Sequence, residues 1–225
     1  HSRDQVHRIK AAVDANGFVR GLADTFYTDQ GGYVRTHGGT VSDLAAALLP
    51  GPYLIPAYHV EGHIRLTNKT PSGTYRAPGR YETTFVRERL MDAIAARLGL
   101  DPMEVRRVNL IPEDRMPFDR GIEALGTHVL YDSGKYHDLL DRTLARIGYR
   151  DLKADLARRR AAGEAVGLGI AFFVEKSGLG PHDLVTMAVQ PDDTIEIVTG
   201  AASVGQGVET AMAQICSDVL GVPIE

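Results

Sequence analysis

The spacing of apolar residues along the chain predicts short strands interspersed with amphipathic helices. Residues 5–13 (QVHRIKAAV) partly alternate between apolar and polar, and the DANG turn that follows predicts a hairpin with a second strand. The clearest helical pattern spaces Val86, Leu90, Ile94 and Leu98 four residues apart, so these side chains share one face. Together the patterns predict strands at 5–13, 18–29 and 57–68, and helices at 40–49, 82–98, 137–147 and 151–162.

Residues that favour helix ends set two further boundaries. Thr40 or Ser42 is expected near the start of the first helix, which should end before Pro50. Asp101 is a good N-cap and Pro102 suits the first helical position, so the MEVRRVN that follows is predicted to be a short helix.

The pattern of apolar and turn-forming residues changes in the second half of the chain. Residues 110–135 hold several turn formers and are predicted to be a long connection. Beyond residue 166, GLGIAFFVEKSG, LVTMAVQ and TIEIVTG are strand-like, PDD is a hairpin turn, and VETAMAQICSDVL is an amphipathic helix. The change favours a domain boundary between 150 and 166, and we assign 1–150 and 151–225 to two domains.

Composition narrows the class of protein. The chain has 225 residues, of which 44% are hydrophobic and 24% charged, as in ordinary globular domains. The 25 basic residues are scattered among 29 acidic ones, which argues against a nucleic-acid partner. No apolar run approaches the roughly 20 residues that span a bilayer. Cys216 is the only cysteine, so no internal disulfide is possible, and we expect a cytoplasmic protein. The chain begins with His1 and ends abruptly, which suggests a piece of a longer protein.

Two glycine-rich turns lie between a predicted strand and a predicted helix: GTYRAPGR (73–80) and GAASVGQG (200–207). Small residues let backbone N–H groups approach a ligand, and a helix N-terminus favours an anion. Arg76 and Arg80 add positive charge that matches phosphate, and the Gln206 amide offers a donor and an acceptor that suit a pterin edge. Neither turn fits the dinucleotide-binding or Walker A pattern.

Taken together, the turns and their flanks resemble a known family. TYRAPG, an amphipathic helix and DPMEVRRVNLI, followed by VTGAASVGQGVETAMAQICSDVLGVP, resemble the large subunit of the xanthine dehydrogenase and aldehyde oxidase family. TNKTPSGTYR and VLYDSGKY are similar to the bacterial branch that includes carbon monoxide dehydrogenase. The resemblance covers essentially the whole chain and implies an elongated α+β subunit of two molybdenum-binding domains, with 1–150 in the first and 151–225 starting the second.

The resemblance also implies a chemistry. The family holds a molybdopterin, in bacteria often as the cytosine dinucleotide, and its molybdenum takes no ligand from an amino acid. The enzymes hydroxylate a carbon with oxygen from water and pass electrons through iron–sulfur clusters to FAD on partner chains or domains. The expected partners are therefore iron–sulfur and FAD subunits and a small organic substrate, with no nucleic acid and no membrane, and a homo-oligomer is possible.

Site residues follow from the resemblance position by position. It assigns the cofactor to Tyr75, Arg76, Ala77, Gly79, Gly205, Gln206, Gly207 and Thr210, and the substrate pocket to Pro78, Phe172 and Phe173. The family's Gly-Gly-x-Phe-Gly-Gly loop has no match here, and its catalytic glutamate is expected beyond the C-terminus. Glu175 and Glu209 do not lie at that motif, so no catalytic residue is named. We expect the isolated piece to bind no cofactor and to be inactive.

Two positions bear on the substrate. Carbon monoxide dehydrogenases of this family carry a cysteine directly after the Tyr-Arg pair, which binds copper, whereas this chain has Ala77. Xanthine and aldehyde enzymes place an aromatic residue two positions after the arginine, whereas this chain has Pro78. The expected substrate is therefore an aldehyde or a nitrogen heterocycle.

Other interpretations remain open at this stage. The chain could be a non-catalytic phosphate- or nucleotide-binding module that shares the two turns, or a docking module for the iron–sulfur and flavin partners. The HVEGH stretch that begins at His59 superficially suggests zinc, but its neighbours favour a strand. Cys216, in the middle of a helix, is better explained as a small core residue than as a nucleophile.

Overall fold

The computed structural model describes residues 3–35, 37–175 and 182–224. The chain forms two compact units, His1–Glu175 and Lys176–Glu225, and each is described by itself. The mixture of helices and strands confirms the predicted α+β class.

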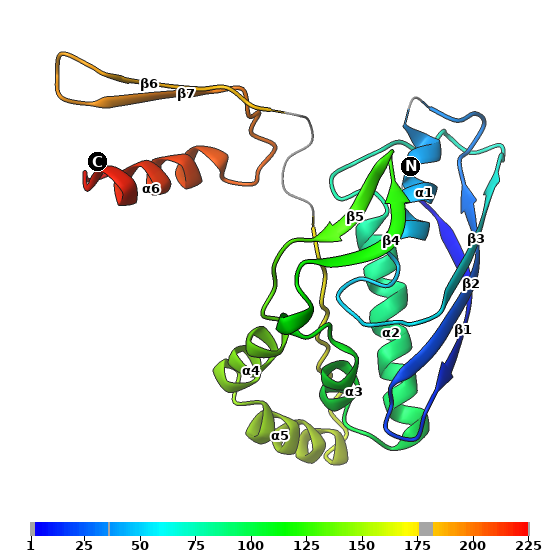
Figure 1. Ribbon diagram of the computed structural model, residues 1–225. Helices are drawn as coiled ribbons and strands as arrows, with labels where there is room; N and C mark the ends of the chain where they lie inside the picture. The colour runs from blue at the N-terminus through cyan, green and yellow to red at the C-terminus, as the bar shows by residue number, and fades with distance from the viewer. Residues whose placement is uncertain (1–2, 36, 176–181, 225) are drawn as a thin grey trace. The chain divides into compact units, whose positions relative to one another are not determined.

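The first unit is built on a three-stranded sheet (Figure 1). Strand β1 (Gln5–Val13) pairs antiparallel with β2 (Val19–Asp29), and β3 (Tyr58–Arg65) pairs with β2 in parallel. In the β1–β2 turn the Asp14 carboxylate accepts hydrogen bonds from the N–H groups of Asn16 and Phe18, at 3.0 and 3.1 Å. The three predicted strands and the hairpin are confirmed, and HVEGH lies in β3.

Helices α1 (Gly38–Leu48) and α2 (Arg80–Leu98) pack on one face of this sheet (Figure 1). The alternation along β1 and β2 favours this arrangement, because Ile9, Val13, Val19, Leu22 and Phe26 share the inward face of the sheet. The resulting core contains Val19, Leu22, Leu49, Tyr53, Ile55, Met91, Ile94 and Ala95. The predicted start of α1 was late: the helix begins at Gly38, Ser42 is buried inside it, and the Thr40 hydroxyl donates back to the His37 carbonyl at 2.7 Å.

Three shorter helices, at the bottom of the view in Figure 1, complete this unit. Helix α3 (Pro102–Asn109) begins as predicted, with the Asp101 carboxylate accepting from the Met103 N–H at 2.8 Å. Helices α4 (Tyr136–Arg146) and α5 (Tyr149–Ala161) confirm the other two helical patterns.

The stretch 110–135 is not a long connection, and that prediction was wrong. It contains the short 3₁₀ helix η1 (Glu113–Arg115) and the antiparallel strands β4 (Phe118–Ala124) and β5 (Thr127–Tyr131). The turn formers belong to this hairpin: Gly126 occupies its tight turn at φ 71°, and Gly121 lies at an irregularity in the pairing. A second core forms where the hairpin contacts α1.

A buried polar network joins α2 to α3. Glu88 accepts hydrogen bonds from Arg106 Nε at 2.9 Å, Arg87 Nε at 3.1 Å and the Tyr53 hydroxyl at 3.0 Å. Arg106 also donates to Asp92 at 2.9 Å. Burial opposes the charge on Arg106, but Glu88, Tyr53 and Asp92 together outweigh it and raise the pKa of the guanidinium. The two arginines and two carboxylates balance, which makes their burial tolerable.

The segment that follows α5 corrects another prediction. Among the described residues 167–175 none belongs to a strand, although GLGIAFF has strand-like composition; the rest of the predicted strand, 176–178, lies outside the described residues. Phe172 and Ile170 instead pack against the first core. The Phe172 carbonyl accepts from Arg87 Nη2 at 2.6 Å, so a side chain takes the place of a neighbouring strand.

The second unit consists of a hairpin and a helix (Figure 1). Strands β6 (Val185–Val189) and β7 (Ile195–Thr199) pair antiparallel, and helix α6 (Val208–Leu220) follows, which confirms all three predictions. The assignment of 1–150 and 151–225 to two domains stays a prediction; α5 and residues up to 175 pack within the first unit.

Candidate cofactor-binding site

The first glycine-rich turn, residues 73–80, enters α2 through two left-handed residues. Ala77 has φ 56° and Gly79 has φ 75°. A Cβ on Gly79 would lie 2.6 Å from the backbone nitrogen of Ala45 and 2.8 Å from Leu44 Cβ. Only glycine therefore fits where this loop crosses α1, and the close approach fixes the path of the backbone into the helix.

The side chains of this loop differ in what they contact. Tyr75 is 77% exposed and Arg76 is exposed, whereas Ala77 and Pro78 are half-buried. Arg80 forms an ion pair with Glu175, with Nε 2.5 Å from Oε1. Of the two arginines that the sequence suggested for phosphate, Arg80 is thus engaged by a carboxylate of its own unit. Glu175 acts there as a structural partner.

A residue that the sequence analysis missed holds this loop from the other side. Arg3, only 6% exposed, donates from Nη1 to the Tyr75 carbonyl at 3.1 Å and from Nε to the Tyr81 hydroxyl at 3.2 Å. Its Nε also lies 2.7 Å from a Glu82 carboxylate oxygen, and its guanidinium lies 4.5 Å from the centre of the Tyr81 ring. The contacts span more than 70 positions of sequence, so no local pattern could have indicated them.

Glu82 is a buried carboxylate in the first turn of α2. Burial raises its pKa, while the helix N-terminus and the Arg3 charge act in the opposite direction. The electrostatics at the helix entrance therefore depend on the Arg3–Glu82 pair as well as on the loop itself.

The second glycine-rich turn lies in the second unit and leads into α6. Gly205 and Gly207 have φ 89° and 74°, and Gly207 is the N-cap residue of the helix. The Gln206 amide braces the loop, because its Oε1 accepts from the Val204 N–H at 2.6 Å and its Nε2 donates to the Ala202 carbonyl at 2.9 Å. Thr210 lies exposed in the first turn of α6.

The predicted substrate-pocket residues separate into two groups. Phe172 is 7% exposed and belongs to the core, whereas the next residue, Phe173, is 69% exposed. The Arg80–Glu175 pair and the Arg87–Phe172 bond hold residues 172–175 against the first turns of α2. The structure thus brings this segment close to the end of the first loop.

The first loop fits an anionic, phosphate-bearing cofactor on its own chemistry. It combines an exposed guanidinium at Arg76, a backbone that only Gly79 allows, and the N-terminus of a 19-residue helix. Each of the two loops belongs to a different unit.

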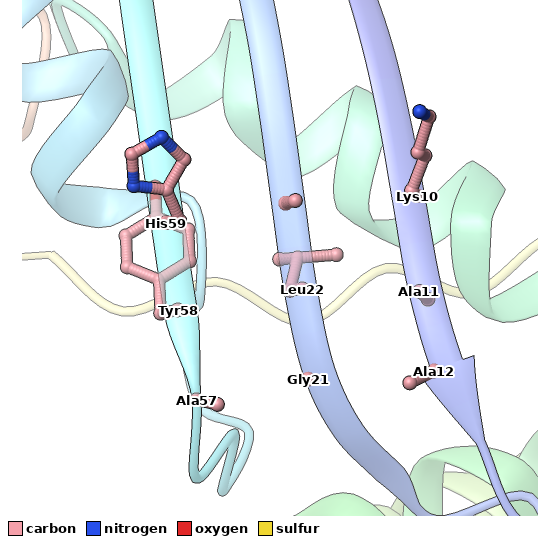
Figure 2. Close-up of a pocket in the computed structure, with 9 residues that line it drawn as sticks. Lys10, Ala11, Ala12, Gly21, Leu22, Ala57, Tyr58 and His59 are labelled. Carbon is pink, nitrogen blue, oxygen red and sulfur yellow. The ribbon is translucent and has the colours of Figure 1, made fainter.

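The first unit also contains an open hollow that is separate from the first loop. It measures about 540 Å³ and lies over β1, β2 and β3, where small residues such as Ala12, Gly21 and Ala57 leave space (Figure 2). Lys10 and His59 stand at its margin, and none of its lining residues belongs to the predicted site.

Within the described ranges, no helix has the length and hydropathy that crossing a membrane requires. The same residues contain no group of three or more His, Cys, Asp or Glu side chains that could hold a metal ion.

Comparison with known proteins places both loops in cofactor-binding regions. Residues 1–110 match a family model described as a molybdopterin cofactor-binding domain, and residues 142–225 match a second model of the same description.

The similar proteins are molybdenum enzymes and subunits of enzyme complexes. The gamma subunit of the 6-hydroxypseudooxynicotine dehydrogenase complex of Paenarthrobacter nicotinovorans is 37% identical over 225 residues, which cover 100% of this chain and 28% of the relative. The nicotine 6-hydroxylase large subunit of the same organism is 32% identical, with 100% and 29% covered. The crystal structure of quinoline 2-oxidoreductase from Pseudomonas putida 86 superposes with a TM-score of 0.81 and 32% identity, over 100% of this chain and 30% of that one.

These matches confirm the resemblance on which the site was predicted. They extend over the whole chain, but the chain spans less than a third of the length of these relatives. The chain belongs to the molybdopterin-binding subunits of the molybdenum hydroxylase family and represents a part of such a subunit.

Proposed function

We propose that the two glycine-rich loops bind the molybdopterin cofactor of a molybdenum hydroxylase. The observation that carries this proposal is that each of the two matched cofactor-binding regions, 1–110 and 142–225, contains one loop. When bound, this cofactor supplies the oxidation chemistry at its metal. The residues of this chain bind and orient it.

Individual residues take different parts in this proposal. Arg76 offers a charge-assisted contact to an oxyanion of the cofactor, and Gly79 and Ala77 set the backbone that approaches it. In the second loop Gly205 and Gly207 allow the approach, Gln206 shapes the loop, and Thr210 stands at the helix start. Tyr75 covers the outer side of the first loop.

The parent protein then hydroxylates an aldehyde or a nitrogen heterocycle with oxygen from water. Relatives named for nicotine and quinoline support the heterocycle class. Ala77 has no thiolate to bind copper, and Pro78 offers an apolar wall without a π surface, so neither carbon monoxide nor xanthine is the expected substrate. Of the two phenylalanines, Phe173 is exposed and available to a substrate ring, whereas Phe172 is buried in the core.

Partners and location follow from the same assignment. Electrons leave through iron–sulfur and FAD subunits, in keeping with relatives that are named as subunits of complexes. We place the protein in the cytoplasm, where a single unpaired Cys216 is stable.

The test uses the full-length subunit co-expressed with its iron–sulfur and FAD partners. We expect about one molybdenum per large subunit and reduction of an artificial electron acceptor with an aldehyde or a nitrogen heterocycle. Carbon monoxide oxidation with bound copper would contradict the argument from Ala77, and rapid xanthine turnover the argument from Pro78. Phosphate binding without molybdenum would favour a non-catalytic module, and capture of the partners without cofactor a docking module.

A single substitution tests the role of the first loop. Arg76→Ala removes a contact worth about 1.5–3 kcal/mol, so cofactor retention should fall by roughly 10- to 150-fold. Arg97→Ala is the matched control, because Arg97 is an exposed arginine in the last turn of α2, at the end of the helix far from the loop. Equal molybdenum content in the two variants would contradict the assigned role.

A further inference from the structure

We infer that Arg3 is the positioning residue of the first cofactor loop, which it holds in its binding geometry while neutralising the carboxylate at the helix entrance. This inference rests on the proposed function of the loop. Arg3 lies just before β1. Its hydrogen bonds go to the Tyr75 carbonyl and the Tyr81 hydroxyl, so it acts on the loop through these groups.

The first argument is geometric. One guanidinium reaches the loop at the Tyr75 carbonyl and the helix at Tyr81 and Glu82, at 3.1, 3.2 and 2.7 Å. Nη1 bonds the loop while Nε faces Tyr81 and the Glu82 carboxylate, so the planar arginine fork spans loop and helix at once, which a lysine ammonium cannot reproduce. Since the Arg3 side chain is only 2% exposed, water cannot easily replace it, and the residue before Arg76 is held by the protein itself.

The second argument is electrostatic. The N-terminus of α2 attracts anions, but Glu82 in its first turn carries a negative charge that would repel an anionic cofactor. Arg3 cancels this charge at 2.7 Å. The helix dipole and Arg76 then present a net positive potential, so the arginine at the start of the chain makes the loop suitable for an anion.

Two variants separate these roles. Arg3→Met combined with Glu82→Gln removes the ion pair without leaving a buried charge, so the fold should survive while the bond to the Tyr75 carbonyl is lost. Arg3→Lys keeps a positive charge near Glu82 but cannot keep all three contacts. Arg8→Met is the matched control, because Arg8 lies in the adjoining strand β1 with its side chain on the exposed face, where it contacts Tyr27.

Limited trypsin cleavage of the 225-residue chain reports the order of the loop. The bond after Arg76 should be cut at least ten times faster in both Arg3 variants than in the wild type and in Arg8→Met. Cleavage within the exposed Arg158–Arg160 run, measured by mass spectrometry in the same samples, should not change. Circular dichroism verifies that each variant is folded. An unchanged rate after Arg76 in a folded variant would overturn the inference.

Molybdenum content of the full-length co-expressed subunit gives the second readout. Arg3→Lys should lower the bound molybdenum at least tenfold after gel filtration, with unchanged turnover per molybdenum that remains. Full molybdenum content with a loosened loop would overturn the positioning role. If the wild-type parent holds no molybdenum, the proposed function fails, and the cleavage experiment still decides what Arg3 does for the loop.

Discussion

Replacing Gly79 by alanine tests whether the close crossing of the first loop over α1 limits this region. The comparison is Gly99→Ala at the other end of α2. Both glycines cap the same helix in the left-handed conformation, with φ 75° and 68°. An added Cβ at Gly79 would meet the backbone of Ala45 at 2.6 Å, whereas at Gly99 nothing lies within 4 Å.

The two substitutions therefore share one cost and differ in another. A left-handed alanine costs about 1–2 kcal/mol at either position. Only Gly79→Ala adds a steric cost of about 1–3 kcal/mol, because Ala45 N and the Leu44 backbone carbon, at 2.6 and 2.9 Å, cannot rotate away. We expect losses of about 2–5 kcal/mol for Gly79→Ala and about 1–2 kcal/mol for Gly99→Ala.

Urea unfolding followed by circular dichroism measures the difference. With a denaturant slope of about 2 kcal/mol per molar, the midpoint of Gly79→Ala should lie about 0.5–1.5 M below that of Gly99→Ala. The alanine at 79 should also expose the loop to trypsin after Arg76. Equal midpoints for the two variants would refute the argument that the crossing of the loop over α1 requires glycine.

Three further predictions follow from other contacts. Arg106→Met should destabilise the protein by about 3–5 kcal/mol in urea titrations, and Arg89→Met, which breaks an exposed pair with the same Asp92, by under about 1 kcal/mol; similar losses would contradict the network. The Lys69 ammonium lowers the pKa of Asp29 to about 2, so the stability that this carboxylate contributes is lost as pH falls from about 4 to about 2, and Asp29→Asn should flatten that part of the acid-unfolding curve. Gln206→Ala should reduce protection of the Val204 amide in hydrogen exchange by about 3- to 10-fold; unchanged protection would show that the brace is absent.

Most of the fold could be predicted because its elements carry local signals. The helix at 102–109 has its cap and proline in adjacent positions, and β1 and β2 are joined by a recognisable turn. Strands β4 and β5 were missed because the turn formers within and around them, such as Gly121 and Gly126, concealed their alternation. The apolar run at 167–173 was misread because strand formation requires a neighbouring strand, which composition does not reveal.

The candidate site was predictable only in its loops. Gly79 and Gln206 stand in glycine-rich sequences that precede helices, and such sequences indicate backbone approach to a ligand. Arg3 and Glu175 had no such signal, because their significance arises from contacts with residues about 80 and 95 positions away. Long-range pairing of charges on α2 depends on the fold and cannot be read from spacing.

Helix α2 also determines where the chain leaves the first unit. Arg80 and Arg87, two turns apart on this helix, hold Glu175 and the Phe172 carbonyl, so the last residues of the unit are attached beside the first loop. A substitution at either arginine would therefore affect both the first loop and residues 172–175, with which the first unit ends. Among homologous sequences, we expect positions 80 and 175 to covary as a charge pair, and insertions to accumulate between 162 and 169 rather than between 170 and 175.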